Sequence, residues 1–167
     1  MGLDIVAFEH ARPVIPCDQD QDEHDNHIVA WVDKNMERSL RGLENGRCYE
    51  VAGADIGFRA GSYSGYNKWR EALALRALGL PAFTVWNDPS RFVERPFFEL
   101  INFSDGQGTI GPEAASDLAT DFSAQRARIA AQPLADPEEE AWFMHVYDQF
   151  QEAFELAASG GGLVLFC

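Results

Sequence analysis

Three segments in which apolar residues recur every three or four positions constrain the fold of this chain more than any other feature of its sequence. Each segment is bounded by residues that begin or end helices. The first follows Ser62 or Ser64, either of which can cap a helix, and it ends at Gly79. The other two each begin with a proline, Pro112 or Pro137, followed by acids near the positive end of the helix dipole. These signals predict three helices.

Short apolar runs elsewhere in the chain predict a sheet. The run that begins at Ile28 fits either a strand to Val32 or a helical stripe through Met36 and Leu40, so both alternatives stay open. The other predicted strands cover residues 3–8, 47–51, 83–86, 97–103 and 163–166. The chain is therefore predicted to be one α+β domain over residues 1–167, with a mainly antiparallel or mixed sheet packed by about three helices. An acidic loop is expected at about residues 17–27.

The charge of the chain excludes one class of partner. With 27 acidic residues against 13 Lys and Arg, the formal net charge is −14. Such a chain repels a nucleic-acid backbone and cannot bind it by neutralising phosphates, although it could imitate one. The charge is also uneven, because residues 132–167 hold seven acids and no Lys or Arg, whereas residues 53–95 hold four acids and six bases.

The cysteines and the N-terminus favour a cytoplasmic protein. Three scattered cysteines, Cys17, Cys48 and Cys167, do not predict a disulfide framework. The chain opens without a basic region followed by a long apolar run, so a signal peptide is not predicted. Its longest apolar stretches are far shorter than a membrane span, and no membrane partner is expected.

The segment from Arg59 to Arg70 departs from the pattern of the other two predicted helices. Lys68 and Arg70 lie near the start of the helix and Arg59 lies just before it, where the helix dipole disfavours cations. A bound phosphate or carboxylate would reconcile these charges with the dipole. Hydrogen bonds and aromatic stacking would complete a site for a small anionic ligand, from Ser62, Ser64, Asn67, Tyr63, Tyr66 and Trp69. The alternative is that serine caps the helix, the aromatic residues pack in the core and the cations pair with surface acids.

A second polar segment is predicted to line the same pocket. Its residues are Asn102, Ser104, Asp105 and Thr109. The run from 106 to 111 matches a dinucleotide-binding fingerprint as a string, but the second strand that such a fold requires is missing, so a connection between a strand and a helix is expected. If a ligand is turned over, Asp105 or Glu99 would act as the acid or base. No pattern requires turnover, and neither a catalytic residue nor a cofactor is predicted.

The acidic loop holds the densest set of residues able to bind a metal: Asp22, Glu23, His24, Asp25 and His27. Carboxylates and imidazoles suit Mn²⁺, Zn²⁺ or Ca²⁺. Their spacing matches neither a calcium-binding loop nor the histidine pair of a zinc protease. A solvated acidic loop is therefore favoured, and no metal is predicted.

Three motifs and the start of the chain resemble a known family. The motifs are GFRAGSYSGYN at residues 57–67, LINFSD at 100–105 and GTIG at 108–111, and the start is MGLDI. They are similar to a family of uncharacterised proteins encoded by bacteriophages, prophages and bacteria. The resemblance implies a small cytoplasmic protein, often carried by a phage, and it implies no activity or catalytic residue.

Two functions from different classes follow from these observations. The first is the binding of a small anionic ligand, nucleotide-like or phosphate-like, where the helix begins at residues 59–70. The second is an acidic interaction protein that blocks a basic host surface, as a nucleic-acid mimic or as an inhibitor of a host defence.

Overall fold

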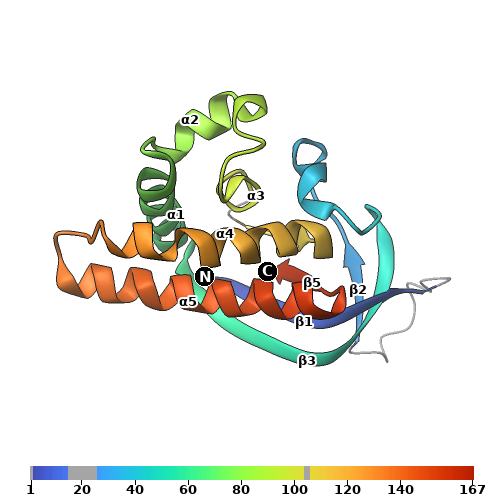
Figure 1. Ribbon diagram of the computed structural model, residues 1–167. Helices are drawn as coiled ribbons and strands as arrows, with labels where there is room; N and C mark the ends of the chain where they lie inside the picture. Colours follow the sequence, from blue (N-terminus) through green and yellow to red (C-terminus); the bar gives the residue numbers. More distant parts are fainter. Residues whose placement is uncertain (1, 15–25, 104–105) are drawn as a thin grey trace.

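A five-stranded antiparallel sheet and three long helices make up most of the protein (Figure 1). The computed structural model describes residues 2–14, 26–103 and 106–167. The strand order is β2-β3-β1-β5-β4. The strands are β1 (Gly2–Pro13), β2 (His27–Ala30), β3 (Arg47–Ser62), β4 (Gly108–Ile110) and β5 (Leu163–Phe166). The predicted α+β fold is confirmed. The predicted acidic loop at about residues 17–27 lies almost entirely outside the described residues.

The sheet is built around β1, which pairs with β3 on one side and β5 on the other. Leu3, Ile5 and Ala7 alternate with more exposed residues, as the two-residue period of a strand with one buried face requires. Ile5 lies opposite Phe58 of β3 and Phe166 of β5. Residues from the beginning, middle and end of the chain therefore meet in one row of the sheet.

Two of the long helices lie side by side over the sheet and run in opposite directions (Figure 1). They are α4 (Pro112–Ala130) and α5 (Pro137–Gly160), and α5 packs on β1 and β3. The third, α1 (Tyr63–Leu78), continues directly from β3. Aromatic rings fill the space between helices and sheet. The ring of Phe150 in α5 lies 4.9 Å from Trp69 of α1 and 5.0 Å from Phe58 of β3.

The helix boundaries follow the predicted capping signals. Ser62 is the N-cap of α1, and its side-chain oxygen accepts a hydrogen bond from the Gly65 amide at 3.1 Å. Gly79 ends α1 in the left-handed conformation that glycine adopts most easily. The carboxylate of Asp136 caps α5 by accepting from the amides of Glu138 and Glu139. All three predicted helices are confirmed.

Four shorter elements show where the sequence patterns were ambiguous or misleading. The predicted strands at 83–86 and 97–103 are wrong, because these segments form helices. The segment at 28–40 contains both of its alternatives, β2 followed by a short helix. The short helices are η1 (Lys34–Leu40), α2 (Ala82–Asn87), η2 (Pro89–Arg91) and α3 (Phe98–Ile101). Periodicity cannot separate a buried strand from a one-turn or two-turn helix in runs this short, so tertiary packing decides.

Two glycine-rich segments contain more strand than expected. Residues 58–62 form the last part of β3 rather than a loop, and they continue its pairing with β1. Gly108 to Ile110 form β4, which pairs with β5, inside the segment expected to connect a strand to a helix. Gly108 has φ +147°, and a Cβ there would lie 2.9 Å from the Phe103 ring. Glycine is therefore required inside this strand for close packing rather than for a loop.

The cysteines are not all free. Cys48 in β3 is disulfide-bonded, whereas Cys167 is free and exposed. The odd number and scattered positions of the cysteines gave no signal of this bond. Because disulfides are typical of oxidising compartments, the cytoplasmic location stays a prediction. None of the helices in the described part of the chain is both long and apolar enough to cross a membrane.

The connection between α5 and β5 provides a sharp test of this packing. A Cβ on Gly162 would lie 1.7 Å from the carbonyl oxygen of Phe8, so Gly162→Ala requires the backbone of β1 or β5 to move. We expect a loss of about 2–4 kcal/mol in the free energy of unfolding, measured by urea denaturation.

Gly57→Ala is the matched control, because its nearest neighbour, the Ile5 carbonyl oxygen, is 4.0 Å away. This variant should change stability by less than about 0.5 kcal/mol. Equal effects of the two substitutions would contradict the close approach of β1 to the end of α5.

Candidate functional site

A cavity of about 630 Å³ opens between η1 and the segment that contains α2 and α3. Figure 1 shows these short elements grouped on one side of the sheet and long helices. Arg70, Asn67 and Asn102 contribute polar groups to the cavity, together with Asn35. Its apolar surface comes from Met36, Trp86, Pro89 and Phe103. The described part of the lining therefore combines one cation, three amides and an exposed aromatic residue.

Arg70 is the most unusual residue of the cavity, because its side chain is charged yet the residue is only 4% exposed. It lies one turn after Tyr66 on the same face of α1, which places its guanidinium carbon 5.2 Å from the centre of the Tyr66 ring. The Trp86 ring lies 4.8 Å away. The guanidinium donates to the carbonyl oxygen of Phe103 and, at 2.5 Å, to Oδ1 of Asn67. These contacts fix the plane of the guanidinium.

The positive charge of Arg70 has no acidic partner among the residues that the structure describes. The ion pairs among the described residues are all formed by cations other than Arg70. The Nε atom of Arg70 is also buried without a hydrogen-bond partner. A buried charge is costly unless an opposite charge and hydrogen bonds compensate it. An oxyanion in the cavity would supply both.

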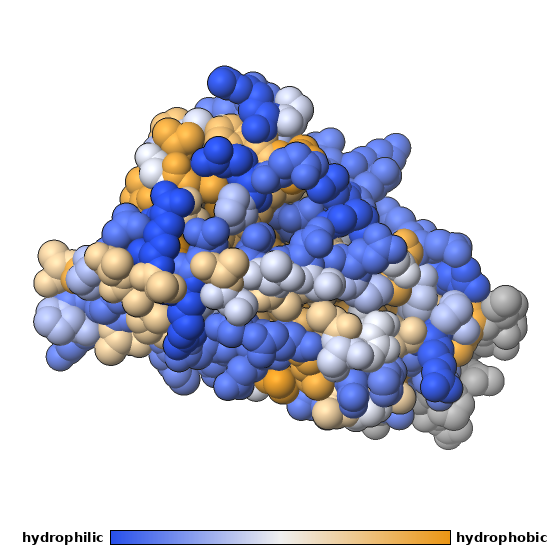
Figure 2. All heavy atoms as spheres, in the orientation of Figure 1, coloured by the Kyte–Doolittle hydropathy of each residue, from blue (hydrophilic) through white to orange (hydrophobic). Residues whose placement is uncertain are grey.

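Trp86 forms a rigid aromatic wall at the opening of the cavity. Its indole Nε1 donates to the carbonyl oxygen of Ile101 at 2.8 Å, which fixes the orientation of the ring. The residue is 43% exposed. Figure 2 shows that apolar residues gather on this part of the surface, over α1 and α2, while hydrophilic residues cover η1. The ring can therefore accept a flat partner on its exposed surface.

The structure brings three of the predicted site residues together in this cavity: Asn67, Arg70 and Asn102. The residues at the start of α1 have other partners. Arg59 is exposed and forms a two-pronged ion pair with Asp4 at 3.0 and 3.1 Å. The hydrogen bond and charge of Asp4 raise the pKa of the Arg59 guanidinium. Ser62 caps the helix, and its oxygen lies 3.1 Å from that of Ser64.

The predicted stacking residues do not form a ligand surface. Tyr66 and Trp69 are buried in the aromatic core, and Nε1 of Trp69 donates to the Phe143 carbonyl oxygen at 3.1 Å. Their role as stacking surfaces is therefore corrected, because neighbouring rings of α5 and the sheet already cover them. Tyr63 is half-buried against the same core, and Lys68 is exposed. Neither lines the cavity.

The residues of the second predicted segment also separate into those that line the cavity and those that do not. Asn102 lines the cavity, whereas Thr109 is buried in β4, where its hydroxyl accepts from the Trp31 amide at 3.3 Å. Thr109 is therefore a structural residue of the sheet, and its predicted place in the pocket is corrected. Ser104 and Asp105 lie outside the described residues.

The sequence did not reveal the residues that complete the cavity. Asn35 and Met36 come from η1, and Trp86 and Pro89 come from the chain around α2 and η2. None of them belongs to a recognisable motif. The dipeptide Asp88-Pro89 is typical of a loop. The position of Trp86 just before this loop is the single sequence signal that could have identified it.

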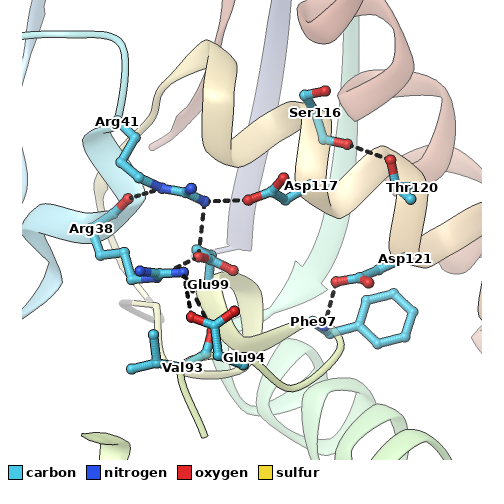
Figure 3. A network of polar contacts seen from close by, with 10 residues as sticks. All are labelled: Arg38, Arg41, Val93, Glu94, Phe97, Glu99, Ser116, Asp117, Thr120 and Asp121. Atoms are coloured by element: carbon cyan, nitrogen blue, oxygen red, sulfur yellow. Dashed lines mark hydrogen bonds and ion pairs between the residues drawn. The ribbon is translucent and has the colours of Figure 1, made fainter.

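A network of charged residues fixes α3 beside this cavity (Figure 3). Glu99 is buried, and one of its oxygens accepts from Arg38 at 2.9 Å and from Arg41 at 3.0 Å. Two guanidinium groups compensate the buried carboxylate, so its geometry is that of an anchor between η1 and α3. Glu99, suggested from the sequence as an acid or base, therefore occupies a structural position between η1 and α3.

Phe97, beside this network, has a strained backbone conformation. Phe97 has φ +60°, the one non-glycine residue with positive φ among those described. Its amide donates to Asp121 at 2.7 Å, which stabilises this unfavourable conformation at the start of α3 (Figure 3). Since α3 leads directly to Asn102 and Phe103, the network determines where one wall of the cavity lies.

The described residues contain no group of three or more His, Cys, Asp or Glu side chains arranged to hold a metal. Most of the acidic loop, residues 22–25 included, lies outside the described ranges, so the solvated, metal-free loop stays a prediction. Comparison of the chain with protein-family models, curated proteins and solved structures found no match.

The titration of Asp121 gives a prediction for this network. Burial raises the pKa of Asp121 to about 6, the Phe97 amide partly opposes this, and the charges of Glu99 and Asp117 raise it further. The pKa of Asp121 is higher in the folded protein than in the unfolded chain. Its contribution to the free energy of unfolding is therefore fully present below about pH 4 and is lost as the pH rises through 6. Asp121→Asn, which keeps an acceptor for Phe97, should remove this loss.

The test is urea denaturation of both proteins between pH 4 and pH 7.5. The stability of the variant relative to the wild type should increase by about 1 kcal/mol across this range, a figure reduced for the partial exposure of the carboxylate. If the free energies of unfolding of the two proteins changed in parallel with pH, the buried contact of Asp121 in α4 with the strained Phe97 at the start of α3 would be contradicted.

Proposed function

We propose that this protein binds a small anionic ligand in the cavity between η1 and α2–α3, with Arg70 as the group that meets the negative charge. The observation that carries the proposal is the buried guanidinium of Arg70, which lines the cavity without an acidic partner among the described residues. A carboxylate or phosphate could accept from its unpartnered Nε and from the adjacent terminal nitrogen.

The cavity suits a small molecule in size and composition. Its volume of about 630 Å³ lies in the range of about 300–1,000 Å³ that is typical of small-molecule sites. An apolar wall with a few fixed polar groups is also typical of such sites. The proposal moves the ligand predicted from the sequence away from the first turn of α1, where Ser62 and Arg59 have partners, to Arg70 two turns along the helix.

The alternative, an acidic protein that blocks a basic host surface, stays a prediction without a structural observation of its own. Part of the predicted acidic surface has an internal role, because Glu140 accepts from Arg76 and, at 2.9 Å, from the Leu134 amide. Burial opposes the ionisation of Glu140, but these hydrogen bonds outweigh it and lower its pKa. The phage association and the cytoplasmic location likewise stay predictions.

Anion binding is tested by titrating the protein with inorganic phosphate and following the thermal unfolding midpoint. Phosphate should raise the midpoint of the wild type. Arg70→Gln should weaken phosphate binding at least about tenfold, because it removes the charge and the hydrogen-bonding fork. Arg70→Lys, which retains the charge but not the fork, should bind with intermediate strength and serves if the glutamine variant is unstable.

Arg59→Gln is the matched control. Arg59 is also a cation near the start of α1, but it is exposed and paired with Asp4. Its substitution should change phosphate binding less than about twofold, as expected for a screened surface charge. Unchanged binding by Arg70→Gln, or loss of binding in Arg59→Gln alone, would overturn the proposal.

A further inference from the structure

The cavity contains more than an anion requires. Inorganic phosphate or a simple carboxylate would occupy a small part of about 630 Å³ and would leave most of the polar lining unused. Asn35 and Asn102 line the cavity with amide side chains, whereas Oδ1 of Asn67 already accepts from Arg70. An amide offers both donors and an acceptor in one plane, which matches the edges of heterocyclic rings.

Trp86 adds a feature that is specific to flat ligands. The guanidinium of Arg70 lies 4.8 Å from its ring, and its indole hydrogen bond to Ile101 holds the ring in place. Trp86 is nevertheless 43% exposed, and it lines the cavity. Aromatic side chains in this situation stack on the flat faces of bases in nucleic-acid complexes.

The charge around the cavity limits the number of phosphates. Among the described residues that line it, Arg70 is the single cation. An adjoining pocket shares Asn35, Met36, Pro89 and Asn102 with the cavity and adds Arg38, but Arg38 is already paired with Glu99 and Glu94. With a formal net charge of −14, the protein repels additional negative charge. One oxyanion is therefore matched, and a chain of phosphates is not.

From these three observations we infer that the ligand is a nucleoside monophosphate, with its phosphate on Arg70 and its base stacked on Trp86 and hydrogen-bonded to the amides of Asn35 and Asn102. This inference rests on the proposed function, since it assigns the chemical class of the anion that Arg70 binds. A free phosphate and a sugar phosphate share the oxyanion but lack the ring. A nucleoside has the ring but lacks the oxyanion, and a nucleoside triphosphate adds charges without partners.

The experiment compares these four kinds of probe with the 5′-monophosphates of adenosine, guanosine, cytidine and uridine by isothermal titration calorimetry. At least one monophosphate should bind ten times more tightly than ribose 5-phosphate or inorganic phosphate. The nucleoside and the triphosphate with the same base should both bind more weakly than that monophosphate. The monophosphate should also quench tryptophan fluorescence.

Trp86→Leu should reduce binding of the monophosphate to the level of ribose 5-phosphate and abolish the quenching. Trp142→Leu is the matched control, because Trp142 is similarly exposed, at 38%, but does not line the cavity. This variant should bind the monophosphate as the wild type does.

The outcomes separate the two proposals. Equal binding of monophosphate, ribose 5-phosphate and inorganic phosphate, all dependent on Arg70, would overturn the nucleotide inference and leave the anion site standing. Tighter binding of the triphosphate would overturn the single-oxyanion argument. Failure of every probe, inorganic phosphate included, would overturn both the inference and the proposed function.

Discussion

The rest of the architecture depends on the contacts that the ring of Phe150 makes. The ring lies in α5, 4.9 Å from Trp69 of α1, 5.0 Å from Phe58 of β3 and 6.1 Å from Phe166 of β5. Elements from the middle and the end of the chain are therefore joined at one side chain. By burying Trp69, this packing sets the rotation of α1, and the rotation in turn places Arg70 at the cavity. The site is a consequence of how the aromatic core orients one helix.

The parts of the fold that the sequence predicts are those with redundant local signals. The three long helices have apolar stripes of several turns together with capping residues such as Ser62 and Asp136, so their patterns and boundaries agree. Residues 97–103 lack this agreement between an apolar stripe of several turns and capping residues. Their short apolar run predicts a strand, whereas the hydrogen bond from the Phe97 amide to Asp121, a partner 24 positions away, stabilises a helical start there. Contacts between distant residues decide such segments, and a single sequence does not display them.

The candidate site shows the same division. The unusual position of Arg70 in a helix start pointed to an anion, and Asn67 and Asn102 were identified with it. The sequence could not show that Arg59 pairs with Asp4 across two strands, because that contact depends on the register of β1 and β3. The sequence therefore identifies three residues that share the cavity, whereas the partners of the others depend on contacts between distant segments. Net charge is equally incomplete as a guide, because the average of −14 conceals a buried cation without an acidic partner among the described residues.

The central claim is that an oxyanion compensates the charge of Arg70, and the most direct test is NMR of the arginine side chains. The Nε–Hε resonance of Arg70, identified by its loss in Arg70→Lys, should shift progressively and saturate as inorganic phosphate is added, because the unpartnered Nε gains an acceptor. The corresponding resonance of Arg59, already bonded to Asp4, should not follow the same curve. An Arg70 resonance that stays unchanged to saturating phosphate, or shifts only together with Arg59, would contradict the account.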